Sequence, residues 1–150
     1  IDRAPNLSGA LQTIAADIAV IDAPAKADAM AAAILSASDI ALIVIQPSGA
    51  DVWASAATVR LVRQKIELGG KIDAAFLVNR AAANTKLSRL IKEGDWNEYG
   101  VDQMTATVGN RAAFAQAMTD GVSVFDLADT AAQAEINQVI NELEAAKWLD

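Results

Sequence analysis

Two polar side chains stand where apolar runs of the sequence end. Asp22 closes the run at residues 17–22 and precedes an Ala-Pro turn, and Asn79 follows the run at residues 72–78. A carboxylate in such a place can hold Mg²⁺ that also binds phosphates, and an asparagine amide can bind a base edge through its paired donor and acceptor. Each has a common structural alternative, because Asp caps the turn that follows it and Asn stabilises its own turn.

Neither cysteine nor histidine occurs in the sequence. Their absence excludes disulfides, thiolate or histidine-ligated metal sites, cysteine nucleophiles and Ser-His-Asp triads in this chain. Chemistry must therefore come from carboxylates, hydroxyls, Lys, Arg, backbone amides or a bound ion.

Gly69, Gly70 and Lys71 have the residue types of a phosphate-binding loop but the wrong place in the chain. A P-loop lies between a strand and the following helix, whose N-terminus faces the phosphate. Here the glycines follow a predicted helix and precede a strand, and Lys65 stands where G-x-x-x-x-G-K needs Gly. No other G-x-x-x-x-G-K or G-x-G-x-x-G occurs, so the sequence predicts no phosphate loop of its own.

The elements that must position these side chains alternate between strands and helices. Apolar runs predict strands at residues 17–22, 40–45, 72–78 and 104–108. Helical spacing and capping residues predict helices at residues 28–38, 51–68, 84–93, 111–118 and 130–147. The alternation predicts an α/β fold, a mostly parallel, three-layer sheet with helices on both faces. Ligands of such sheets bind at the carboxyl ends of the strands, here the loops at 22–26, 46–51, 79–85 and 108–111.

Three local details follow from the same patterns. The run at residues 40–45 is continuously apolar, so we expect burial on both faces of the sheet. Asp51 is expected to be the N-cap of the next helix. Thr130 and Gln133 fit a capping box that opens the last helix.

The length of 150 residues and the apolar fraction of 53% predict one domain with a real core, over residues 1–150. Net charge is −7, yet eight of the twelve basic residues lie between Arg60 and Lys92, against only two acidic ones. This asymmetry predicts a basic face on an acidic body, suited to the phosphates of nucleic acid. Alternatively, these charges are solvated helix faces that never converge. The face comprises Arg60, Arg63, Lys86, Arg89 and Lys92.

Several of these stretches, in this order, resemble the C-terminal two-thirds of the ParA/MinD-type deviant-Walker ATPases, particularly the small ParA-type DNA-partition proteins. The resemblance covers residues 17–143. It rests on Asp-Ala-Pro after the strand at 18–21, Ala-Ser-Asp with a strand and Gln-Pro-Ser at 37–48, Asn-Arg at 79–80, Leu-Ser-Arg at 87–89, and the loops at 108–111 and 121–126. Departures are Ala-Lys at 25–26, where Pro or Gly is usual, and Gly109, where many members have Pro.

The resemblance implies P-loop NTPase-like architecture and particular residue roles. Asp22 would assist Mg²⁺ near the γ-phosphate, as the catalytic and metal-binding residue. The base of ATP would lie against Asn79, Arg80, Val108, Gly109 and Asn110. Arg89 matches a DNA-contacting position of some members. The family's P-loop and switch Asp would precede Ile1, so we expect this chain to be the C-terminal part of a larger ATPase domain, inactive alone.

The implied function is that of a ParA-type ATPase in plasmid or chromosome partition. ATP would drive formation of a homodimer, the dimer would bind DNA non-specifically, and a centromere-binding adaptor protein of ParB type would stimulate hydrolysis. The location would be cytoplasmic and nucleoid-associated. An acidic last helix argues against membrane attachment of the MinD kind. The alternative is a non-catalytic interaction module on the same fold.

Overall fold

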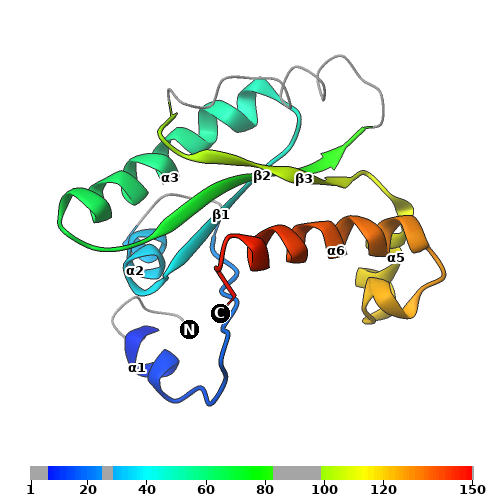
Figure 1. Ribbon diagram of the computed structural model, residues 1–150, viewed down its shortest axis with the longest axis horizontal. Helices are drawn as coiled ribbons and strands as arrows, with labels where there is room; N and C mark the ends of the chain where they lie inside the picture. The colour runs from blue at the N-terminus through cyan, green and yellow to red at the C-terminus, as the bar shows by residue number, and fades with distance from the viewer. Residues whose placement is uncertain (1–6, 25–28, 83–98, 150) are drawn as a thin grey trace.

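The computed structural model describes residues 7–24, 29–82 and 99–149 and has an α/β fold around a three-stranded parallel sheet. The strands stand in the order β1-β2-β3, and the sheet lies between α3 and α6 (Figure 1). The predicted fold class, a parallel sheet with helices on both faces, is therefore confirmed. The strands are β1 (Ile40–Ile45), β2 (Asp73–Ala81) and β3 (Asp102–Gly109). The helices are α1 (Leu7–Gln12), α2 (Ala29–Ala37), α3 (Gly49–Glu67), α5 (Ala112–Asp120), the 3₁₀ turn η3 (Val124–Asp126) and α6 (Thr130–Ala145).

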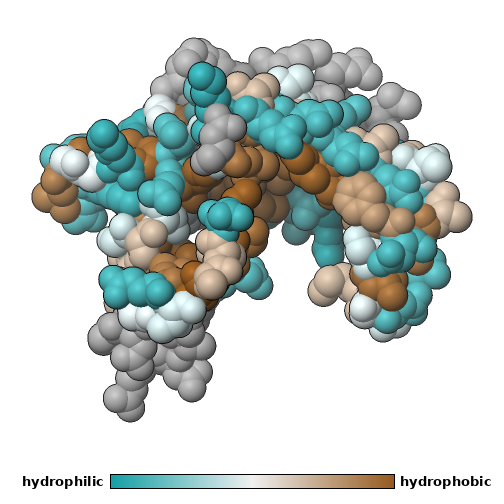
Figure 2. Space-filling view, turned by 60° about the horizontal axis from the view of Figure 1, so that its bottom comes forward, coloured by the Kyte–Doolittle hydropathy of each residue, from teal (hydrophilic) through white to brown (hydrophobic). Residues whose placement is uncertain are grey.

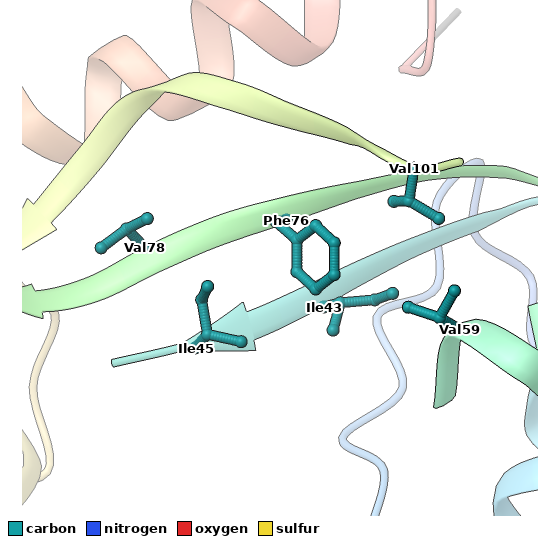
Figure 3. Close-up of a cluster of buried hydrophobic side chains, with 6 residues drawn as sticks. All are labelled: Ile43, Ile45, Val59, Phe76, Val78 and Val101. Carbon is teal, nitrogen blue, oxygen red and sulfur yellow. The ribbon is translucent and has the colours of Figure 1, made fainter. Parts of the chain in front are cut away.

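One core lies between the sheet and α3. Phe76 at its centre is fully buried, and the ring of Tyr99 meets it edge-on at a centroid distance of 5.9 Å. Alternate residues of β1 and β2 point to this face because side chains along a strand alternate. The cluster, drawn in Figure 3, comprises Ile43, Ile45, Val59, Phe76, Val78 and Val101.

A second core lies on the opposite face, under α6. Val139 of α6 packs with buried residues of β2 and β3, among them Leu77 and Met104. This helix covers β2 and β3 but leaves β1 bare. Leu42 is 37% exposed and Val44 is 56% exposed, so the expected burial of β1 on both faces is wrong. A space-filling view shows apolar surface in the hollow on this side of the molecule (Figure 2).

The strand predicted at residues 17–22 is wrong, since residues 13–24 form neither helix nor strand. Ile18 is 52% exposed and Val20 is 93% exposed. A strand forms only beside another strand that bonds to its backbone N–H and C=O groups. Neither β1, β2 nor β3 pairs with residues 17–22. The apolar pattern is typical of a strand, but no described strand lies beside this segment to pair with it.

Two predicted helix caps are displaced by one to three residues. Ser48, not Asp51, caps α3, because its side chain accepts a hydrogen bond from the Ala50 N–H. Asp51 instead accepts from the Gln46 N–H at 3.0 Å, which closes the loop after β1. At α6 the cap is Asp129, whose Oδ1 accepts from the Ala132 N–H at 2.9 Å, so the predicted capping box at Thr130 is wrong. Short polar side chains compete for the same unpaired amides, and local backbone geometry selects between them.

Lys65 joins α3 to the end of α2. Its Nζ donates to the backbone carbonyls of Leu35, Ser36 and Ser38 at 2.9, 3.1 and 2.6 Å. These carbonyls lie at and just after the C-terminus of α2, where the last turn lacks its usual i+4 donors and, of the backbone donors, only the Ser38 N–H bonds to the Leu35 carbonyl. Gly70 leaves room for the lysine stem, because a Cβ there would lie 2.8 Å from Lys65 Cγ.

Candidate functional site

The carboxyl ends of β2 and β3 form one continuous edge. Ala81 pairs with Gly109 across the two strands, and the Asn110 N–H donates to the Ala81 carbonyl at 3.1 Å. The strands end toward the side of the molecule where α5 lies (Figure 1). The two stretches singled out from the sequence, at residues 79–80 and 108–110, therefore lie side by side.

Asn79 and Arg80 fall inside the last residues of β2 rather than after it. Asn79 Oδ1 accepts from the Arg80 N–H at 2.7 Å, which is the turn-stabilising role offered as the structural alternative. Arg80 is exposed and has a φ of +52°, a left-handed conformation that costs free energy for a residue with a side chain. The strained residue lies at the carboxyl edge of the sheet, and such strain is common at functional sites.

Glu135 of α6 holds the loop that follows β3. Its Oε2 accepts from the Gly109 N–H at 2.9 Å, and its Oε1 accepts from Arg111 Nε at 3.0 Å and Nη2 at 2.8 Å. Glu135 raises the pKa of Arg111 further, so the guanidinium remains charged. The carboxylate thus bonds to the residues on both sides of Asn110, which are Gly109 and Arg111.

Glu142 makes a similar contact two turns further along α6. Its two carboxylate oxygens accept from the N–H groups of Thr105 and Ala106, each at 2.7 Å. The register of β3 against β2 shifts between Gln103 and Thr107, an irregularity that exposes consecutive amides toward α6. Glu142 therefore accepts hydrogen bonds from two β3 amides at the place where the register between β2 and β3 is irregular.

Sequence reasoning missed both glutamates. The available signal was their spacing of seven residues, which places them on the same helix face as the buried Ala132 and Val139. A carboxylate on an apolar helix face requires partners, and β3 supplies them.

Asp22 lies exposed in the irregular segment, so its expected place at the end of a sheet strand is wrong. Among the described residues no three carboxylates gather to hold a metal ion. Asp22 does not belong to any strand that pairs at the edge formed by Asn79 and Gly109. Its catalytic and metal-binding roles remain predictions.

The predicted basic face is described only in part. Arg60 and Arg63 are exposed on α3, as the helical spacing predicted. Arg63 lies over the turn before β3, since a Cβ on Gly100 would be 2.7 Å from Arg63 Nη2. Lys86, Arg89 and Lys92 lie outside the described residues, as does the helix predicted at residues 84–93. In the described part, no helix is long and apolar enough to cross a membrane.

These features define an α/β protein whose polar loops gather at the carboxyl edge of a parallel sheet. No family model matches the chain. A curated relative is the "Maintenance of carboxysome distribution protein A" of Halothiobacillus neapolitanus, which is 32% identical over 130 residues. The match covers 85% of this chain and 60% of the relative, so the chain spans less than two-thirds of the relative's length.

Proposed function

We propose that this chain is part of a ParA/MinD-type ATPase. The pairing of the carboxyl ends of β2 and β3 carries the proposal, because it brings Asn79 and Arg80 beside Val108, Gly109 and Asn110. In the family that the sequence resembles, these two stretches hold adenine. Similarity to the curated relative over most of the chain supports the same family.

ATP and Mg²⁺ are the proposed cofactors. Asn79 and Asn110 would hold the base, and Asp22 would hold Mg²⁺ near the phosphates. Asp22 is exposed and unconstrained by a strand in this structure, so a phosphate-bound Mg²⁺ has access to its carboxylate. Nucleotide binding is proposed to drive homodimer formation.

The proposed cellular role is positioning a cargo along the nucleoid in the cytoplasm. The relative's name states that it maintains the distribution of carboxysomes, which supports a protein assembly as cargo over a plasmid or chromosome. The protein binds nucleoid DNA non-specifically in this proposal. The DNA-binding residues are Arg60, Arg63, Lys86, Arg89 and Lys92. An adaptor protein bound to the cargo, of ParB type if the cargo is DNA, stimulates hydrolysis.

The first experiment measures ATP affinity by calorimetry and ATP turnover in the complete protein. Asp22→Ala is expected to lower turnover by about a hundredfold with ATP affinity nearly unchanged, because the carboxylate would assist Mg²⁺ while most of the binding free energy would come from phosphate and base contacts. Asp17→Ala, in the same exposed segment, is the matched control and should change neither. Equal losses of affinity and turnover in Asp22→Ala would assign it a structural role. No ATP binding by the unmodified complete protein would favour a non-catalytic interaction module.

A second experiment tests the basic face by DNA affinity at several salt concentrations. Arg63→Ala and Arg89→Ala should each weaken binding about equally for all sequences and flatten the salt slope by roughly one unit. Lys71→Ala removes one charge between α3 and β2, outside the proposed face, and is the control. An unchanged slope in the double variant Arg63→Ala/Arg89→Ala would show that these charges are only a solvated surface.

A further inference from the structure

The loop after β3 is fixed by three separate contacts within three residues. The N–H of Gly109 and the guanidinium of Arg111 both bond to Glu135, and the N–H of Asn110 between them bonds to Ala81 of β2. Two of these anchors come from one carboxylate, whose side chain is 18% exposed. Asn110 itself remains exposed, held by its backbone at the end of the sheet.

Gly109 is required for this arrangement in two ways. It supplies an N–H, and it leaves space, since a Cβ there would lie 3.0 Å from Glu135 Oε1 and 3.2 Å from Oε2. Proline, which many proteins of the resembling family carry at this place, would provide neither the donor nor the space. The contact between Glu135 and Gly109 is therefore a property of the residues in this chain.

We propose that Glu135 is a positioning residue that sets the preference of this edge for adenine over guanine nucleotides. The inference rests on the proposed function, because it assumes that the edge at Asn79 and Asn110 holds the base. Adenine and guanine present opposite donors and acceptors at their six-membered rings, so discrimination requires backbone and amide groups held in one orientation. Glu135 supplies that rigidity by fixing both neighbours of Asn110.

The loss of one anchor should therefore reduce selectivity more than overall binding. A loosened loop can reorient its amides toward guanine, whereas a rigid loop leaves a mismatched donor or acceptor unpaired. The phosphates do not contact this loop in the proposed arrangement, so their contribution to affinity should remain.

The experiment compares Glu135→Gln with the unmodified complete protein by calorimetry, using ATP, GTP and inorganic triphosphate as the three probes. Glutamine keeps the size of the side chain but removes the charge that faces Arg111. We expect the ratio of ATP affinity to GTP affinity to fall by about tenfold, with triphosphate affinity unchanged. Gly109→Ala, which pushes a methyl group against the carboxylate, should lower the same ratio.

Glu142→Gln is the matched control. It removes the same charge from the same helix against the same strand, but at Thr105 and Ala106, away from the carboxyl end. It should lower stability without changing the nucleotide ratio. An equal fall in both variants, or an unchanged ratio in Glu135→Gln, would overturn the positioning role. If the unmodified protein binds triphosphate but neither nucleotide preferentially, the base site fails, whereas no binding of any probe overturns the proposed function itself.

Discussion

The two edges of the sheet are built differently. At β3, α6 lies along the strand, and its glutamates accept from the N–H groups of Thr105, Ala106 and Gly109. At β1, no described strand pairs with the outer edge, and Val44 on the uncovered face is 56% exposed. Unpaired strand edges and exposed apolar faces favour association with other chains. The difference shows that α6 stabilises β3 by supplying both apolar cover and hydrogen-bond acceptors.

The largest expected effect is a difference in stability between alanine variants of two leucines on the same face of the sheet. Leu77 of β2 is 8% exposed under α6, whereas Leu42 of the neighbouring β1 is 37% exposed. Leu77→Ala should lower the free energy of unfolding by about 3 kcal/mol through lost burial and a cavity, and Leu42→Ala by about 1 kcal/mol or less. Chemical denaturation of both variants measures the difference. Equal losses would mean that β1 is covered in solution.

A medium effect is expected when the acceptor on the β3 edge is removed. Glu142→Ala leaves the N–H groups of Thr105 and Ala106 without their carboxylate, and should cost about 2 kcal/mol. Glu144→Ala, an exposed glutamate of the same helix, is the control and should stay within about 0.5 kcal/mol. The denaturation midpoints of both variants measure these losses. An unchanged midpoint in Glu142→Ala would mean that water replaces the carboxylate without loss of stability.

The smallest effect on stability is expected at the open edge. Val44→Lys places a charge on the exposed face of β1, so stability should change by about 0.5 kcal/mol or less. Self-association, measured by sedimentation at increasing concentration, should fall because a charged side chain disfavours burial of this apolar face against another chain. Unchanged self-association would show that this face does not mediate contacts between copies.

The sequence predicted the elements well where local patterns decide. Residues 40–45 were predicted as a strand and form β1 with the same bounds, because a β-branched run ends at Gln46-Pro47. Residues 17–22 carry the same pattern without forming a strand, since a strand exists only beside a partner. The expected double burial of β1 failed for a related reason, because the position of α6 depends on packing rather than on the β1 sequence.

The candidate site was predicted in part. Residues 79–80 and 108–110 were placed at strand ends and do meet there, because parallel strands end on one edge of a sheet. The role of Glu135 was not predictable from its own neighbours in sequence. It depends on amides of β3, which lie 26 residues away in the chain, and on the space beside Gly109.

Lys65 has a consequence for chemical reactivity. An amine reacts with acylating reagents only through its unprotonated lone pair, and the Nζ of Lys65 donates to three carbonyls between 2.6 and 3.1 Å away. Reaction would require breaking those contacts, so Lys65 should label far more slowly than the exposed Lys71. The labelling rate of this one lysine therefore reports when α2 separates from α3, whether by local opening or by global unfolding.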